Sequence, residues 1–110
     1  SLMASFIGVS GSGIAYVLHF LHALSLGGVQ AGLPYRKALD LAAATALGAV
    51  SLLQKTGSHP VDLVTQVTSP GGTTIEGIHA LEAGGVTDAV MQAVMRSAKK
   101  SETIGKPKGE

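Results

Sequence analysis

Apolar residues recur at helical spacing along the whole sequence, and this period constrains the fold more than any other feature. Ile14, Val17, Leu18 and Leu21 follow the i, i+3, i+4, i+7 rule, and no stretch alternates as a β-strand does. Glycine and proline divide the pattern into segments. We therefore predict an all-α domain of about five helices. They cover roughly residues 14–31, 35–55, 60–67, 74–83 and 87–100.

Glycine, histidine and serine mark the expected helix ends. Gly57 is placed to cap the 35–55 helix in the left-handed conformation. His59 precedes a proline and is expected to act as a cap or turn residue, whereas His79 is expected to face solvent or an interface. Residues 8–13 predict a flexible turn, and Gly27 with Gly28 predicts fraying of the first helix. Thr87 or Asp88 is expected to cap the last helix.

The sequence shows no internal repeat and no interdomain linker, so one domain is expected. We assign residues 1–8 to an N-terminal leader that need not be entirely native. Residues 9–102 form the folded domain, and residues 103–110 are expected to be a disordered tail because glycine, proline and lysine dominate there.

Charged residues make up only 14% of the chain, against roughly a quarter in an average soluble domain. We expect the chain to hide a large apolar face against a partner. The net charge of +1 gives no electrostatic case for nucleic acid or for an anionic membrane. The absence of cysteine excludes disulfides and thiolate sites and fits a reducing compartment. No basic segment precedes an apolar run, so no signal peptide is predicted and a cytoplasmic location is expected.

A membrane span is the alternative for residues 14–29, which are largely apolar. This stretch is shorter than the ~20 residues that a spanning helix requires. It carries His19 and His22, and Gly27 with Gly28 is expected to break it. A buried helix at an interface between subunits is therefore the preferred interpretation.

Residues 67–76 read Val-Thr-Ser-Pro-Gly-Gly-Thr-Thr-Ile-Glu. Pro70 is expected to end the preceding helix, and Gly71 and Gly72 leave their amide groups unshielded. Thr73 and Glu76 have the spacing of a capping box, which starts a new helix. Exposed amides at a helix N-terminus form a binding site for a small anion such as a carboxylate. An ordinary corner between two helices is an equally weighted alternative.

No group of residues in the sequence has the spacing of a catalytic site. His19 and His22 are one turn apart, a spacing that can bind a metal, but no third ligand lies nearby, so packed or interface histidines and no metal are expected. Residues 8–13 offer glycines before a helix but lack the strand and the later acidic residue of a dinucleotide-binding unit. Thr74 can donate a hydrogen bond or relay a proton, and a larger acceleration requires a cofactor.

Several segments together carry a family resemblance. They are Ser-Gly-Ser-Gly-Ile-Ala-Tyr at 10–16, Gly-Leu-Pro at 32–34, Gly-Ser-His-Pro at 57–60, residues 67–75, and Leu-Glu-Ala-Gly-Gly at 81–85. In this order they resemble the C-terminal dimerisation domain of pyrroline-5-carboxylate reductases, over roughly residues 9–102.

The resemblance implies an interlocked helical dimerisation domain of the type that follows a Rossmann domain. Such oxidoreductases reduce pyrroline-5-carboxylate to proline, in proline biosynthesis, with NADPH or NADH held mainly by the Rossmann domain. They form homodimers that can assemble into decamers, with the substrate pocket at the interface and no metal. The resemblance places the substrate carboxylate against Ser69, Gly71, Gly72, Thr73 and Thr74. It places Thr74 beside the ring nitrogen, as a catalytic residue that helps to protonate it.

Three departures from the family pattern qualify these expectations. Ile14 stands where the family has proline, and His22 replaces a common acidic residue. The Rossmann domain is absent from this sequence, so the chain resembles an excised or truncated part and is expected to be inactive alone. A purely structural oligomerisation module with a vestigial pocket is the alternative function.

Overall fold

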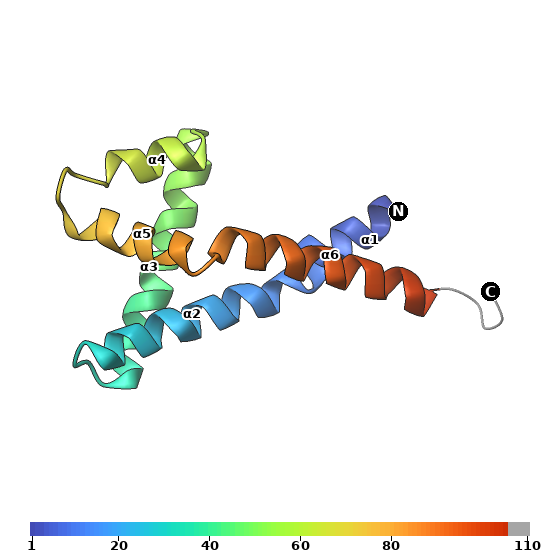
Figure 1. The fold of residues 1–110 in the computed structure, drawn as a ribbon, viewed down its shortest axis with the longest axis horizontal. Helices are drawn as coiled ribbons and strands as arrows, with labels where there is room; N and C mark the ends of the chain where they lie inside the picture. The colour runs from blue at the N-terminus through green and yellow to red at the C-terminus, as the bar shows by residue number, and fades with distance from the viewer. Residues whose placement is uncertain (106–110) are drawn as a thin grey trace. The chain divides into compact units, whose positions relative to one another are not determined.

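The computed structural model describes residues 1–105, and within them it contains helices and no β-strand (Figure 1). Three segments, α1, the π-helical η1 and α2, form one continuous helix, Leu2–Gln30. With it the described chain has five helical segments, which confirms the all-α prediction. The elements are α1 (Leu2–Phe6), η1 (Ile7–Gly11), α2 (Gly13–Gln30), α3 (Tyr35–Thr56), α4 (Pro60–Gln66), α5 (Thr73–Ala83) and α6 (Val86–Gly105).

The chain divides into two compact units. The single domain expected from sequence stays a prediction. Unit 1 combines Ser1–His19 with the described part of Glu82–Glu110, and unit 2 is Phe20–Leu81. The division falls inside α2 and inside α5, so no linker marks it.

In unit 1, α1 and η1 pack against α6. A Cβ atom on Gly8 would lie 2.8 Å from the carbonyl oxygen of Val94, so only glycine allows this approach. The hydroxyls of Ser12 and Ser97 lie 2.5 Å apart, and the Tyr16 hydroxyl donates to the carbonyl of Ala93 at 3.3 Å. The prediction of a flexible turn at residues 8–13 is therefore wrong, because helical packing uses Gly8 for close contact.

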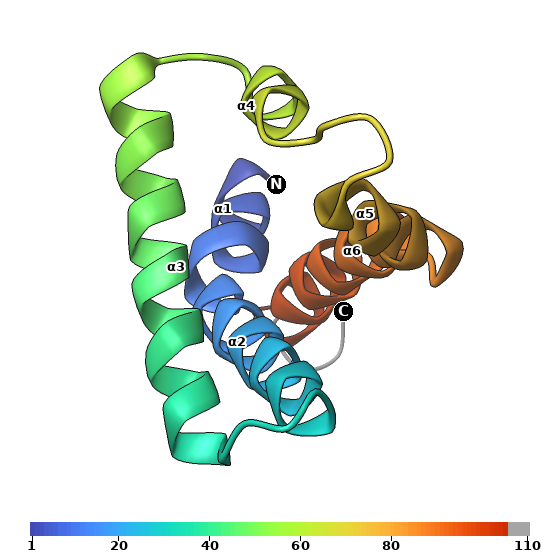
Figure 2. The same cartoon turned by 90° about the vertical axis from the view of Figure 1, so that its left-hand side faces the viewer.

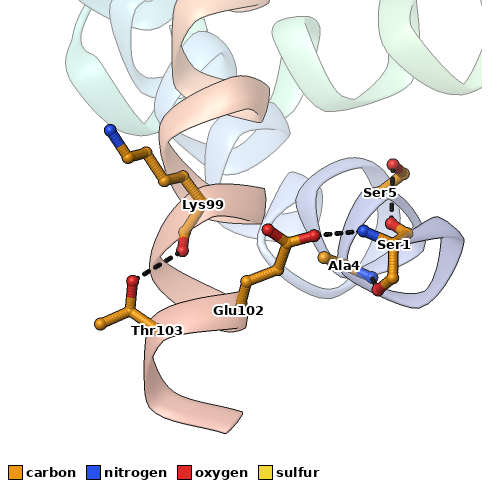
Figure 3. Close-up of polar contacts among 6 residues, drawn as sticks. All are labelled: Ser1, Ala4, Ser5, Lys99, Glu102 and Thr103. Carbon is orange, nitrogen blue, oxygen red and sulfur yellow. Dashed lines mark hydrogen bonds and ion pairs between the residues drawn. The ribbon is translucent and has the colours of Figure 1, made fainter. Parts of the chain in front are cut away.

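Helical structure also extends beyond the limits drawn from sequence, 9–102. Residues assigned to the leader form α1, and the amino group of Ser1 pairs with the carboxylate of Glu102 on α6 (Figure 3). At the other end, the Thr103 hydroxyl donates to the Lys99 carbonyl at 3.1 Å, and α6 continues to Gly105 (Figure 3). The predicted helix end near residue 100 and the tail assignment of 103–105 are wrong. Residues 106–110 lie outside the described residues, and the domain limits themselves stay a prediction.

In unit 2, small residues bring α2 and α3 close together. A Cβ atom on Gly28 would lie 2.8 Å from the Cβ of Ala38. Ala38 and Ala42 are buried, and so is Ser25, whose hydroxyl donates to the Leu21 carbonyl. The predicted fraying at Gly27 and Gly28 is wrong, because α2 runs through both to Gln30 and packs there on α3.

Two of the predicted helix ends in unit 2 are confirmed. Gly57 has a φ of 63°, and its amide donates to the Leu53 carbonyl at 3.0 Å. The Nδ1 atom of His59 accepts from the amide of Val61 at 3.1 Å and caps α4. The exposed ring of His79 also agrees with expectation.

The start of α6, in unit 1, differs from the predicted one. Helix α6 begins at Val86, and the Gly85 carbonyl accepts its first hydrogen bond, from Ala89. The Thr87 hydroxyl instead donates to the carboxylate of Glu82. Caps at Thr87 or Asp88 are therefore wrong, because Gly85, with φ of 78°, already turns the chain into the helix.

Most large apolar side chains of the described residues are exposed, among them Leu47 at 74% and Leu18 at 60%. The exposure of these side chains agrees with the expectation, drawn from the scarcity of charge, that a partner covers an apolar face.

Helix Leu2–Gln30 is also long and apolar enough to cross a membrane, by length and composition alone. Gly27 and Gly28 do not interrupt it, so that part of the case against a span is wrong. A helix buried between subunits passes the same test, and the absence of a membrane partner stays a prediction.

Candidate functional site

The residues predicted to hold a carboxylate lie in one loop of unit 2, between α4 and α5. The Gly72 amide donates to the Ser69 carbonyl at 3.0 Å and closes a four-residue turn. Pro70 occupies the second position of this turn, and Gly71 occupies the third with a φ of 69°. A positive φ at the third position defines a type II turn, which proline and glycine favour in these two places.

Gly72 is constrained by contact rather than by φ. A Cβ atom there would lie 2.4 Å from the Ser69 Oγ and 3.2 Å from the Ser69 carbonyl oxygen. The Ser69 side chain thus folds against the backbone of the turn. Two consecutive glycines are explained by two requirements: the left-handed angle at Gly71 and the close approach at Gly72.

Helix α5 begins at Thr73, directly after the turn. The first amides of a helix have no partner within it, and within residues 1–105 the amides of Thr73, Thr74 and Ile75 have none in a turn or cap either. They point out of a helix N-terminus that carries partial positive charge. The arrangement can therefore bind a small anion by backbone donors.

The capping box predicted at Thr73 and Glu76 is wrong in register. Thr73 is the first residue of the helix, so Gly72, and not Thr73, occupies the cap position. No hydrogen bond in the described chain joins the Thr73 hydroxyl to the Glu76 amide. Thr73 and Thr74 are both exposed, so their hydroxyls are accessible to a ligand. Glu76 lies in the first turn of α5, where its carboxylate interacts with the same helix end.

A second polar contact in unit 2 was not predicted from sequence. The Nδ1 atom of His22 lies 2.8 Å from the Tyr35 hydroxyl, and the two rings meet edge to face with centroids 5.7 Å apart. This contact joins α2 to the first residue of α3. No local sequence pattern predicts this contact, because it depends on how the Gly-Leu-Pro turn places α3 beside α2.

No group of three or more metal-binding side chains occurs within the described residues. The glycine-rich stretch 8–13 covers most of η1 and the start of α2, without the preceding strand that a dinucleotide-binding loop requires. No described residue is therefore assigned to a nucleotide.

Comparison with known proteins agrees with this architecture. Residues 1–104 match the protein family described as "Pyrroline-5-carboxylate reductase dimerisation". Similar proteins include a pyrroline-5-carboxylate reductase of Glycine max, 54% identical over 97 residues, which covers 88% of this chain and 35% of the relative. Another is a pyrroline-5-carboxylate reductase of Methanosarcina acetivorans, 46% identical over 106 residues, covering 96% of this chain and 39% of the relative.

Solved structures give the same match. The pyrroline carboxylate reductase of Plasmodium falciparum, crystallised with NADP bound, superposes with a TM-score of 0.90 at 33% identity, over 94% of this chain and 40% of that one. The 1-pyrroline-5-carboxylate reductase of Streptococcus pyogenes gives a TM-score of 0.88 at 36% identity, over 91% of this chain and 39% of that one. The present chain thus spans well under half the length of the relatives that it matches. It belongs to the pyrroline-5-carboxylate reductase dimerisation family.

Proposed function

We propose that this chain supplies the dimerisation and substrate-binding part of an NAD(P)H-dependent pyrroline-5-carboxylate reductase. In this proposal residues 69–74 bind the carboxylate shared by pyrroline-5-carboxylate and proline. The observation that carries the proposal is the sequence of a closed type II turn and a helix start whose first amides have no partner. Such a site recognises a planar anion without a charged side chain.

The exposed hydroxyls give the site a second element. With the carboxylate at the amides of Thr73 and Thr74, a hydroxyl on the first turn of α5 is within reach of the substrate ring. We assign to Thr74 the hydrogen bond to the ring nitrogen, where it orients the imine and assists protonation. Ser69, Gly71, Gly72 and Thr73 hold the carboxylate.

Reduction of an imine also requires a hydride, which a nicotinamide nucleotide supplies when it is bound. One relative was crystallised with NADP, and the described residues of this chain form no dinucleotide-binding unit. We therefore expect the 110-residue chain, assayed by itself with pyrroline-5-carboxylate and NADPH or NADH, to show background turnover. Robust turnover would contradict the proposal that this chain alone cannot bind the nucleotide.

The family name implies that the chain associates with a second copy. A homodimer that assembles further, to a decamer for example, is part of the proposal, and so is a cytoplasmic location. The exposed apolar surface and the lack of cysteine support these two points respectively.

Titration with proline tests the binding site, and L-prolinol is the matched control because it lacks the carboxylate. We expect millimolar proline to shift the amide resonances of residues 69–74, and we expect prolinol to leave them in place. Equal shifts with both ligands would mean that residues 69–74 do not recognise the carboxylate. No shift with proline would favour the alternative, a purely structural oligomerisation module with a vestigial pocket.

A further inference from the structure

Unit 1 contains a cavity that shares no residue with the loop at 69–74. It lies between the continuous first helix and α6, which pack against each other through α1 and η1 and run side by side in Figure 2. The cavity has a volume of about 390 Å³, which lies within the range of pockets that hold small molecules. Its lining residues are Ile7, Ser12 and Tyr16 of the first helix and Ser97, Lys100, Ser101 and Ile104 of α6.

A π-helical turn brings two of these residues to the same side of the first helix. The Ser12 amide donates to the Ile7 carbonyl, five residues back, at 2.8 Å. In a regular α-helix, residues five apart point about 140° away from each other, so the two side chains would not line one cavity. Such π-helical turns inside α-helices are frequent at functional sites. On α6 the four lining residues have the spacing i, i+3, i+4, i+7 and therefore share one face.

The serine hydroxyls of this cavity can still donate hydrogen bonds. The Ser12 and Ser97 hydroxyls lie 2.5 Å apart, so one of their two protons forms the bond between them. Within residues 1–105 the second proton has no acceptor, and the Ser101 hydroxyl has no hydrogen-bond partner. The Tyr16 hydroxyl is already used, because it donates to the Ala93 carbonyl. The cavity thus offers a ligand two hydroxyl donors, on serines that are half-buried.

The cavity also has one cation and no carboxylate. Lys100 forms no ion pair within residues 1–105, and no Asp or Glu lines the cavity. Glu102 lines a neighbouring cavity instead, where it pairs with the amino group of Ser1. The partial negative charge at the C-terminus of α6 falls off within the last turn, which contributes only Ile104 to the lining. The cavity therefore favours an anion.

The set of donors favours a phosphate over a carboxylate or an amino acid. A lysine ammonium binds phosphate as a point charge, and the two hydroxyl donors leave a hydrogen bond for each of two further terminal oxygens. An amino acid would also bring an ammonium group, for which the lining has no carboxylate. Ile7 and Ile104 supply apolar contact for the rest of a ligand.

We infer that this cavity of unit 1 binds a small phosphate monoester. Its phosphate lies at Lys100 and the serine hydroxyls, and its apolar part packs against Ile7 and Ile104. The cavity and the proposed carboxylate site lie in different units. The inference therefore does not depend on the proposed substrate.

Phenyl phosphate is a suitable probe, because it combines a phosphate with a small apolar ring. Titration of the 110-residue chain, followed by two-dimensional NMR, reports both the dissociation constant and the place of binding. We expect millimolar phenyl phosphate to shift the amide resonances of Ser12, Ser97 and Ser101. Benzoate, which has the same ring but a carboxylate, is expected to bind these residues more weakly.

Two results of this titration would overturn the inference. One is the absence of shifts at the three serines, and the other is equal affinity for benzoate. Shifts at residues 69–74 report on the proposed carboxylate site, so the failure of one proposal is distinguished from the failure of the other.

Two adjacent lysines provide a matched test of the charge. Lys100→Gln removes the cation of the cavity, whereas Lys99→Gln removes the same charge from a residue that does not line it. We expect Lys100→Gln to raise the dissociation constant of phenyl phosphate about tenfold. Lys99→Gln is expected to change it by less than about threefold. Equal effects would overturn the inference, because they would mean that the probe binds to the general positive charge of α6.

The hydroxyl donor of Ser101 is tested in the same way. Ser101→Ala is expected to raise the dissociation constant about threefold or more. Thr103→Ala is the control, because the Thr103 hydroxyl donates to the Lys99 carbonyl and does not line the cavity. Equal effects of these two variants would contradict the inference. If a variant loses its helical circular dichroism, the shifts of the unsubstituted chain and the comparison with benzoate decide.

Discussion

The amide of Gly72 donates a 3.0 Å hydrogen bond to the carbonyl oxygen of Ser69, which closes the turn in front of α5. This single bond sets the direction in which the following amides point. The proposed carboxylate site is therefore shaped by backbone geometry before any ligand arrives. Substitutions that disturb the backbone are expected to affect it more than substitutions that change charge.

The left-handed angle of Gly71 gives the first prediction. Gly71→Ala places a Cβ at a φ of 69° and is expected to cost about 1–2 kcal/mol of unfolding free energy. Gly77→Ala is the control, because Gly77 lies inside α5 with open space around its Cα and no positive φ. That variant is expected to stabilise the chain by roughly 0.5–1 kcal/mol. Urea unfolding at one fixed protomer concentration measures both, and equal effects would contradict the turn assignment.

The contact between α2 and α3 gives the second prediction, on neighbouring glycines. Gly28→Ala would set two Cβ atoms 2.8 Å apart, against Ala38, and is expected to cost about 1–3 kcal/mol by overpacking. Gly27→Ala meets nothing within 4 Å and is expected to be neutral or mildly stabilising. Thermal unfolding followed by circular dichroism separates the two variants. A tolerant Gly28→Ala would mean that the helices are not held this closely.

The cap of α4 gives the third prediction. His59→Ala removes the acceptor for the Val61 amide and is expected to cost about 0.5–1 kcal/mol. His59→Asn keeps an acceptor that helix N-caps favour and should restore most of the loss. His79→Ala is the control, because that ring is exposed and accepts no capping bond. If Asn fails to rescue the Ala variant, the imidazole contributes by some means other than capping.

The proposed role of Thr74 gives the fourth prediction, which is made for a reductase chain that also carries a nucleotide-binding domain. Thr74→Ala is expected to lower kcat by roughly ten- to a thousand-fold. Thr74→Ser keeps the hydroxyl and should retain most of the activity. A pH profile of kcat distinguishes a proton-transfer role from simple loss of binding, which would appear in KM. Unchanged kinetics for Thr74→Ala would remove this residue from the mechanism.

Local signals explain what could be predicted from sequence. Gly57 and His59 act on the backbone within a few residues of themselves, so their capping roles follow from the chain alone. The type II turn is likewise encoded in Ser-Pro-Gly-Gly. The all-α fold follows from the helical period, which needs no tertiary information.

The errors at Gly8 and Gly28 share one physical cause, which is contact with a neighbouring element. The sequence pattern predicts a flexible turn at Gly8 and fraying at Gly28, yet each lies within a helix and admits a neighbouring element, Val94 on α6 or Ala38 on α3. Glycine in a helix has the same appearance in sequence whether it frays the helix or packs it. The register error at Thr73 has a local cause, because the turn closed by the Gly72 amide and the Ser69 carbonyl starts the helix one residue earlier than a Thr73 cap requires.

The direct test of the central claim is the mass of the chain in solution. Size-exclusion chromatography with light scattering, at micromolar to hundred-micromolar concentration, is expected to give at least twice the protomer mass of 11.1 kDa. This result is expected because the exposed apolar surface requires a second copy to cover it. A stable, soluble monomer throughout that range would contradict the account.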